Sequence, residues 1–115
     1  MAARIAFADK KKPRALLLSD PAWEALSEDA ILQGKSPNVI CDTLIREYLL
    51  RPLEDASVVE YPGLEKTQHN LRLLDSLWKD LRLRALQEGR SASALMEQLL
   101  REYYGLPMPP PQLPA

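Results

Sequence analysis

Hydrophobic residues follow two different patterns along the first half of the chain. Residues 14–19, RALLLS, form a short apolar run that is typical of a β-strand. In residues 21–33 and 37–49 hydrophobic residues recur every three or four positions, which indicates two amphipathic helices. The repeating positions are, in chain order, Leu16 and Leu18, then Trp23, Leu26 and Ala30, then Ile40, Leu44 and Tyr48. The pattern predicts one strand followed by two helices.

Short polar residues and a glycine mark where these helices begin and end. Asp20 followed by Pro21 is a favourable helix start, because aspartate caps free backbone amides and proline suits the first turn. Gly34 stands where a helix commonly ends in a left-handed residue. Ser36 precedes the second helical pattern and is its expected N-cap.

The whole pattern repeats 55 residues later without a gap. The matching residues are Leu71, Leu73, Asp75, Trp78, Leu81, Ala85, Gly89, Ser91 and Leu99, and the tripeptide Arg-Glu-Tyr of 46–48 recurs at 101–103. The second unit is therefore predicted as a strand over 68–74 and helices over 76–88 and 92–104. The apolar stripe of its last helix is Leu95, Leu99 and Tyr103.

The duplication divides the chain into five segments. They are a basic N-terminal arm at 1–12, a first unit at 13–50, an acidic linker at 51–66, a second unit at 67–105 and a proline-rich tail at 106–115. The linker contains two prolines and a glycine and has no helical period, with a short extended piece expected at 57–61. We expect the proline-rich tail to be extended or disordered.

The residue composition of the chain argues against several classes of site. The single cysteine, Cys41, and the single histidine, His69, give neither an internal disulfide nor a four-ligand zinc site. The chain also has no Ser/His/Asp set, no repeated carboxylate pair and no glycine-rich phosphate loop, so we expect neither an enzyme nor a bound cofactor. Cys41 is expected to be a small packing residue, and the two tryptophans, Trp23 and Trp78, are expected to anchor the core.

Charge is distributed unevenly along the chain. The net charge is −1, but residues 52–65 carry four carboxylates and no basic residue, whereas residues 66–104 carry seven basic and five acidic residues. A local basic surface is therefore compatible with a slightly acidic chain. No apolar run reaches the roughly 18–20 residues that a membrane span needs, so we expect a cytoplasmic protein without a membrane partner.

The two units resemble the ribbon-helix-helix family of DNA-binding proteins, the Arc, MetJ and CopG kind. The resemblance rests on RALLLSDPAWEAL with GKSPNVICDTLIREYL, and on HNLRLLDSLWKDL with GRSASALMEQLLREYY. It implies a mainly helical fold with a two-stranded antiparallel ribbon. Because a lone strand has no partner for its backbone groups, it also implies that one chain supplies both halves as a single-chain pseudo-dimer.

In such a fold, alternate residues of each strand face the helices and the others face the major groove of DNA. Because Leu71 and Leu73 face inward, Gln68, Asn70 and Arg72 face outward, and these side chains suit the edges of bases. The first strand departs from this pattern. Its outward residues are Pro13, Ala15 and Leu17, of which Ala15 and Leu17 suit either thymine methyl groups or an apolar protein partner, while Arg14 faces inward.

The start of each second helix is the other expected DNA contact, because free amides and the positive end of the helix dipole favour phosphate. The expected phosphate-contacting residues are Lys35, Ser36, Arg90 and Ser91, together with Lys12 before the first strand.

These residues predict sequence-specific binding to double-stranded DNA by a repressor-like regulator, with chains associating side by side on DNA. The alternative is a protein-interaction module, partner-binding or antitoxin-like, in which DNA reading has degenerated. The apolar outward residues Ala15 and Leu17 favour that alternative.

Overall fold

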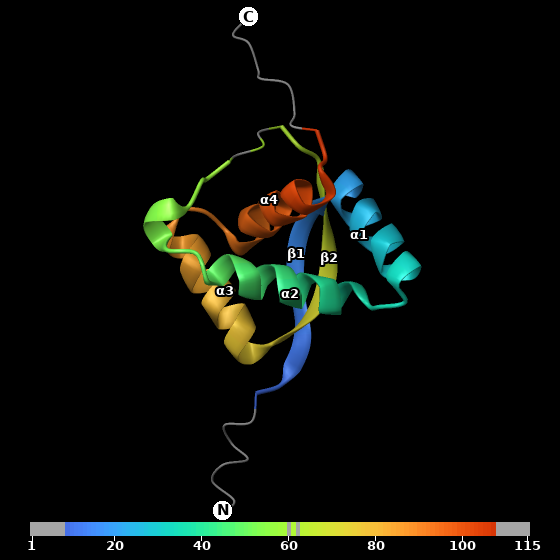
Figure 1. The fold of residues 1–115 in the computed structure, drawn as a ribbon, viewed down its shortest axis with the longest axis horizontal. Helices are drawn as coiled ribbons and strands as arrows, with labels where there is room; N and C mark the ends of the chain where they lie inside the picture. The colour runs from blue at the N-terminus through green and yellow to red at the C-terminus, as the bar shows by residue number, and fades with distance from the viewer. Residues whose placement is uncertain (1–8, 60, 62, 108–115) are drawn as a thin grey trace, which may run out of the picture.

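The computed structural model describes residues 9–59, 61 and 63–107, and in this part of the chain two strands and four α-helices form a mostly helical fold (Figure 1). The elements are β1 (Lys11–Ser19), α1 (Asp20–Gln33), α2 (Pro37–Leu49), the short 3-10 helix η2 (Leu53–Asp55), β2 (Lys66–Leu74), α3 (Asp75–Gln87) and α4 (Ala92–Tyr104). The order strand, helix, helix thus occurs twice, as the repeat predicts.

The two strands pair antiparallel into one ribbon. The register runs from Lys11 opposite Leu74 to Ser19 opposite Lys66, with Ala15 opposite Asn70 in the middle. Both strands begin earlier than predicted, because backbone pairing continues through polar residues that the alternation of leucines does not reach. Lys11 and Lys12 therefore belong to β1 and not to an N-terminal arm.

The helices cover one face of the ribbon and interlock the two halves. In Figure 1, α2 and α4 cross the ribbon, and α1 and α3 lie on either side of it. The second helix of each half contacts the strand of the other half, α4 with β1 and α2 with β2. Each half thus completes the core of the other.

The core lies between the ribbon and the helices. It comprises Leu16, Leu18, Leu71 and Leu73 from the ribbon, Ala22, Leu26, Ala30, Leu77, Leu81 and Ala85 from the first helices, and Ile40, Cys41, Ile45, Tyr48, Leu95, Met96, Leu99 and Leu100 from the second helices. Cys41 is a buried packing residue, as expected. Tyr103 departs from its predicted stripe, because it is 53% exposed where the matching Tyr48 is buried.

The prediction that the tryptophans anchor the core needs correction. Ala22 and Leu77 occupy the buried positions, and Trp23 and Trp78 lie half-buried at the edges of the core. The buried face of each first helix follows an i, i+4 spacing that begins one residue before the tryptophan. Trp23 stacks on His69 with ring centroids 4.1 Å apart, and the Arg14 guanidinium lies over Trp78.

The predicted helix caps are largely confirmed, with one shift. Ser19, not Asp20, caps α1, and its hydroxyl accepts from the amide of Ala22. Gly34 and Gly89 both have the positive φ expected of them, 65° and 75°. At the second helices, Ser91 caps α4 through its side chain, whereas Ser36 occupies the N-cap position of α2 without a side-chain hydrogen bond.

Side chains of α3 and α4 hold the linker, Arg84 at its start and Gln98 in its middle. The Gln98 amide donates to the carbonyl of Ser57 and accepts from the amide of Val59. The extended piece predicted at 57–61 forms no strand in its described residues.

Most of the proline-rich tail lies outside the described residues, as do residues 1–8 of the arm. Among the helices that the structure describes, none has the length and apolarity needed to cross a membrane.

Candidate nucleic-acid interface

The uncovered side of the ribbon forms what we call the outer ribbon face. It comprises Lys11, Pro13, Ala15 and Leu17 from β1, and Lys66, Gln68, Asn70 and Arg72 from β2. All eight residues are exposed, because the leucines between them point into the core. The structure thus places Gln68, Asn70 and Arg72 on the solvent side, together with Ala15 and Leu17.

Pairing across the ribbon sets each polar side chain against a small or apolar one. Arg72 lies opposite Pro13, Asn70 opposite Ala15 and Gln68 opposite Leu17. The polar row follows β2 and the apolar row follows β1. The outer ribbon face is therefore chemically asymmetric about its central pair.

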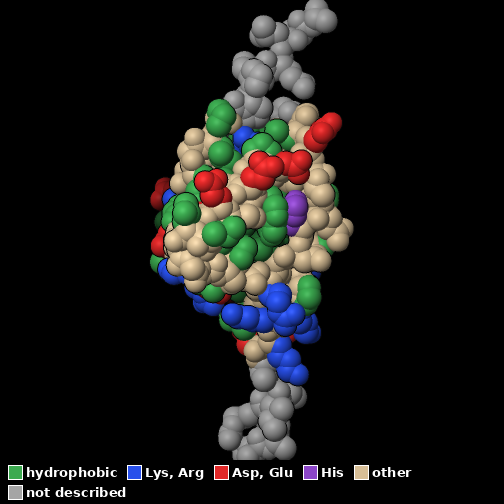
Figure 2. Space-filling model, turned by 90° about the vertical axis from the view of Figure 1, so that its right-hand side faces the viewer, with side chains coloured by type: hydrophobic (Ala, Val, Ile, Leu, Met, Phe, Trp, Pro, Cys, Tyr) green, Lys and Arg blue, Asp and Glu red, His purple; other side chains and the backbone are tan. Residues whose placement is uncertain are grey.

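The outer ribbon face carries positive charge and no carboxylate. Its cations are Lys11 and Arg72 towards one end and Lys66 at the other. Figure 2 shows lysine and arginine side chains gathered near the end of the molecule from which the N-terminal trace leaves. A surface with this charge attracts polyanions despite the net charge of −1 on the chain.

The backbone of Arg72 is anchored while its side chain stays in solvent. Its amide donates to Oδ1 of Asn38 at 2.8 Å, and its guanidinium donates to the carbonyl of Lys11 at 3.3 Å. The second of these bonds crosses the ribbon at an exposed position. The guanidinium thus lies over the outer ribbon face and keeps free donors for a ligand.

The N-termini of α2 and α4 lie at opposite edges of the ribbon. Asn38, in the first turn of α2, accepts from the amide of Arg72 in β2, and Ser93, in the first turn of α4, accepts from the amide of Leu17 in β1 at 2.9 Å. Asn38 and Ser93 are 55 positions apart, as are Leu17 and Arg72. The same edge contact is therefore made twice, and it fixes both helix starts beside the outer ribbon face.

These two edge residues were not predicted from the sequence, nor was the position of Lys11 and Lys66 on the outer ribbon face. The 55-residue repeat holds a signal for all four, because Asn38 pairs with Ser93 and Lys11 with Lys66 in that register. Hydrogen-bonding side chains at matched positions in the first turn indicate a shared contact. The alternation of leucines alone does not reveal it.

The expected phosphate contacts fall into two groups. Lys35, Ser36 and Ser91 are exposed at the starts of the second helices, and Lys12 is also exposed, with an ion pair of 3.6 Å to Asp75. Arg90 needs correction. Its side chain is only 4% exposed and its guanidinium donates to Glu88, Gln98 and Tyr48, so it is not free for phosphate.

Arg14 of β1 and His69 of β2 occupy matched positions that face the helices and not the outer ribbon face. As predicted, Arg14 faces inward, where its guanidinium pairs with Asp75 and donates to the carbonyl of Leu73. The hydrogen bond from Arg14 and the charge of Lys12 lower the pKa of the Asp75 carboxyl. His69 occupies the matching position in β2, and its Nε2 is buried without a hydrogen-bond partner in the described structure.

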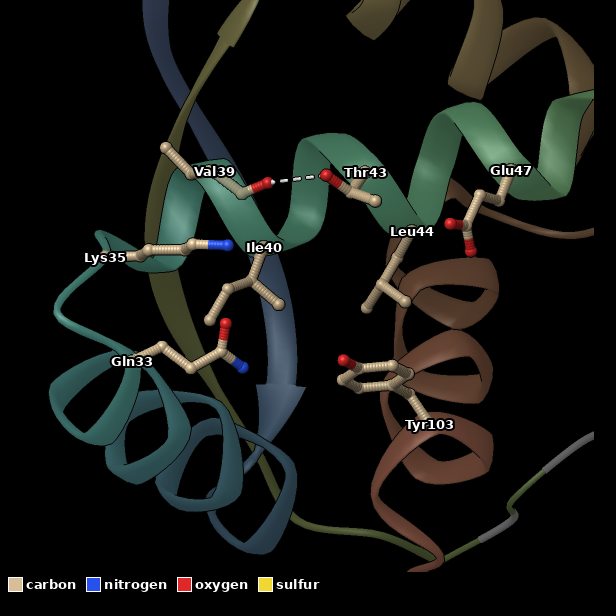
Figure 3. Close-up of a pocket in the computed structure, with 8 residues that line it drawn as sticks. All are labelled: Gln33, Lys35, Val39, Ile40, Thr43, Leu44, Glu47 and Tyr103. Atoms are coloured by element: carbon tan, nitrogen blue, oxygen red, sulfur yellow. Dashed lines mark hydrogen bonds between the residues drawn. The ribbon is translucent and has the colours of Figure 1, made fainter.

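The helical side of the described structure also carries cavities. A cavity of about 110 Å³ lies between α1, α2 and α4, lined by Gln33, Lys35, Val39, Ile40, Thr43, Leu44, Glu47 and Tyr103 (Figure 3). Its polar groups come from scattered positions, and the Thr43 hydroxyl donates to the carbonyl of Val39. The described residues contain no cluster of three potential metal ligands.

Comparisons of the chain with protein-family models, with curated proteins and with solved structures found no match.

Proposed function

We propose that the protein binds double-stranded DNA by inserting the outer ribbon face into the major groove, and that it acts as a sequence-specific, repressor-like regulator. One observation carries the proposal. Gln68, Asn70 and Arg72 stand in one exposed row on a face that has three cations and no carboxylate. The major groove admits a two-stranded ribbon, and these side-chain types suit base edges.

The arrangement supports a single-chain pseudo-dimer of ribbon-helix-helix units as the scaffold. Ala15 and Asn70 are matched by the repeat and also lie opposite each other, so the pairing register is symmetric about them. The crossed contacts of α2 with β2 and α4 with β1 have the same symmetry. Duplication thus supplies the two strands that one groove-binding ribbon needs.

Base recognition in this proposal is divided unequally between the strands. Arg72 suits guanine O6 and N7, and Asn70 and Gln68 suit adenine N6 and N7. In β1, Ala15 and Leu17 offer only apolar contact, for which thymine methyl groups are the matching partner. The preferred site is therefore non-palindromic, because two-fold related positions of the ribbon carry different chemistry.

Phosphate contacts would hold the ribbon in place on both sides. The amides at the start of α2 lie beside exposed Lys35 and Ser36, and those at the start of α4 lie beside exposed Ser91. Helix N-termini favour anions through their free amides and dipole. With Arg90 buried, the α4 side relies on Ser91 and the helix amides.

The test begins with selection of binding sites from a pool of random duplexes, followed by measurement of Kd by fluorescence anisotropy. Arg72→Ala should weaken binding to the selected site by about 1–3 kcal/mol, or about fivefold to 150-fold, and relax the preference at one base pair. Binding should also weaken steeply with salt, since each phosphate contact releases counterions.

Arg51→Ala is the matched control, because it removes the same charge from an exposed residue beyond the far end of α2. A helix of this length places Arg51 about 20 Å from the ribbon edge. Equal losses for the two variants would contradict base recognition by Arg72. Failure to select any duplex at low salt would instead favour the protein-interaction alternative, which the half-exposed Leu17 supports.

A further inference from the structure

The outer surfaces of α1 and α3 differ in charge, although the repeat makes the two helices equivalent. Four carboxylates and no basic residue occur in α1, namely Asp20, Glu24, Glu28 and Asp29. At the positions that match Glu24, Ser27 and Glu28, α3 carries Lys79, Arg82 and Leu83. All of these α3 residues are exposed. The duplicated surface has thus diverged to opposite charge.

Both surfaces also expose large hydrophobic side chains beside these charges. Ile31 and Leu32 of α1 are 80% and 78% exposed, and Leu83 and Leu86 of α3 are 50% and 73% exposed. Ile31 and Leu86 are matched by the repeat. Figure 2 faces the side of the molecule where α1 lies and shows acidic and hydrophobic side chains close together there. Each surface combines one sign of charge with an unburied apolar area.

The surface of α3 is hollowed and can receive side chains. A shallow cavity of about 450 Å³ is lined by Trp78, Lys79, Arg82, Leu83, Leu86, Arg90, Ser91 and Ala92. Arg90 is already paired with Glu88, so Lys79 and Arg82 are the cations available at its rim. The one exposed carboxylate on α3, Asp80, borders a separate hollow with Leu49, Arg84 and Gln87.

We infer that the α3 surface binds the α1 surface of a second copy of this chain, with the two helices side by side and parallel. In that orientation Glu24 and Glu28 meet Lys79 and Arg82, while Ile31 enters the hollow beside Leu86. The charged and apolar contacts form together, because matched residues have the same spacing along both helices. An antiparallel arrangement would place the apolar Ile31 against the charged Lys79. The charged and apolar contacts could then not form together, so we infer the parallel orientation.

This contact is directional. The surfaces of α1 and α3 lie on opposite sides of the molecule (Figure 1), so a contact between two different surfaces leaves one of each free at the ends of the pair. Such a contact adds further copies in a row instead of closing a two-fold dimer. On DNA, the row would set the orientation of neighbouring chains. The contact itself needs no DNA.

Charge exchange tests the inference, with sedimentation velocity measured on the full chain without DNA. Glu24→Lys with Glu28→Lys should weaken self-association by at least about tenfold, and so should Lys79→Glu with Arg82→Glu, because like charges then oppose each other. The chain carrying all four substitutions should associate again, since it restores both complementarity and the native net charge of −1. A 1:1 mixture of the two double variants should do the same.

Covalent trapping provides a second readout that does not depend on charge. A mixture of Ile31→Cys and Leu86→Cys chains should form a disulfide-linked dimer faster than either chain alone, and native Cys41 is fully buried and does not compete. A monomer at all concentrations, or no recovery in the fourfold variant, would overturn the inference. Loss of DNA affinity with unchanged self-association in the Lys79 and Arg82 variant would also overturn it, and would assign this surface to DNA.

Discussion

At the scale of single residues, the repeat creates matched pairs whose surroundings differ. Glu97 on α4 is fully buried and its carboxylate accepts from the amide and hydroxyl of Ser19, at 2.8 and 2.6 Å, and from Arg101 at 2.7 Å. The matching pair on α2, Asp42 with Arg46, is partly exposed and has no such third partner. The same ion pair is thus internal in one half and superficial in the other.

We therefore expect unequal effects of removing the two carboxylates. Glu97→Ala should lower the free energy of unfolding by about 3–5 kcal/mol, because it leaves the Arg101 guanidinium buried without its charge partner. Asp42→Ala should cost less than about 1 kcal/mol, as is usual for exposed pairs within a helix. Urea unfolding at pH 7 measures both. Similar losses in the two variants would show that burial does not increase the contribution of Glu97 to the free energy of unfolding.

A second buried carboxylate predicts how stability depends on pH. Burial of Glu88 raises its pKa, but hydrogen bonds from Tyr48, Arg84 and Arg90 outweigh burial, and the pKa lies below the usual value. A carboxyl with a lowered folded pKa stabilises the fold above its unfolded pKa, and this contribution is lost as the pH falls through the folded value.

Stability should therefore be level near neutral pH and decline as the pH falls below about 4.5, the range in which an unfolded glutamate titrates. Glu88→Gln should make this decline shallower, in addition to lowering stability at pH 7. Asp9 and Asp75 also have lowered pKa values, so part of the decline should remain in the variant. Urea midpoints measured from pH 3 to pH 7 test this, and an unchanged slope in Glu88→Gln would count against it.

At the scale of elements, each half turns from its first to its second helix through a glycine. Gly34 and Gly89 have φ values of 65° and 75°, and a Cβ at either position would meet no atom within 4 Å. The cost of alanine there is thus conformational and not steric crowding by neighbours. Gly34→Ala and Gly89→Ala should each lower the free energy of unfolding by about 1–2 kcal/mol. Asparagine, which tolerates this conformation better, should cost less at both positions, and thermal unfolding distinguishes the variants.

The elements were more predictable than the contacts between them. Hydrophobic periodicity predicted the second helices at 37–49 and 92–104 with the bounds observed, since each follows a serine cap after a glycine turn. Alternation also separated the inward from the outward residues of β2, and the 55-residue repeat extended that assignment to β1. Periodicity did not predict that Arg90 is buried, because the residues that bind it, Tyr48 and Gln98, come from two other parts of the fold. Local patterns set a helix face, whereas the pairing of polar groups depends on tertiary neighbours.

At the scale of the whole molecule, the two halves depend on each other. Among the described residues, β1 pairs only with the strand of the other half, and α4 of the second half packs on it. We expect separate fragments 1–63 and 64–115 to lack cooperative unfolding at micromolar concentration, because each would leave an unpaired strand and an open core. An equimolar mixture should regain helical circular dichroism, with a Tm that rises with concentration.

Glu97 should make the mixed pair of fragments more stable than either fragment paired with itself. If two copies of 64–115 paired, the repeat would place Leu74 where Ser19 now donates to Glu97, and the buried carboxylate would lose the hydroxyl, one of its three donors. Glu97→Ala in the second fragment should therefore weaken the mixed complex more than any homotypic one. Sedimentation equilibrium of the fragments, alone and mixed, measures the difference. A cooperative, concentration-independent transition in fragment 1–63 alone would contradict mutual dependence, because the first half would then stabilise its own core without β2 and α4.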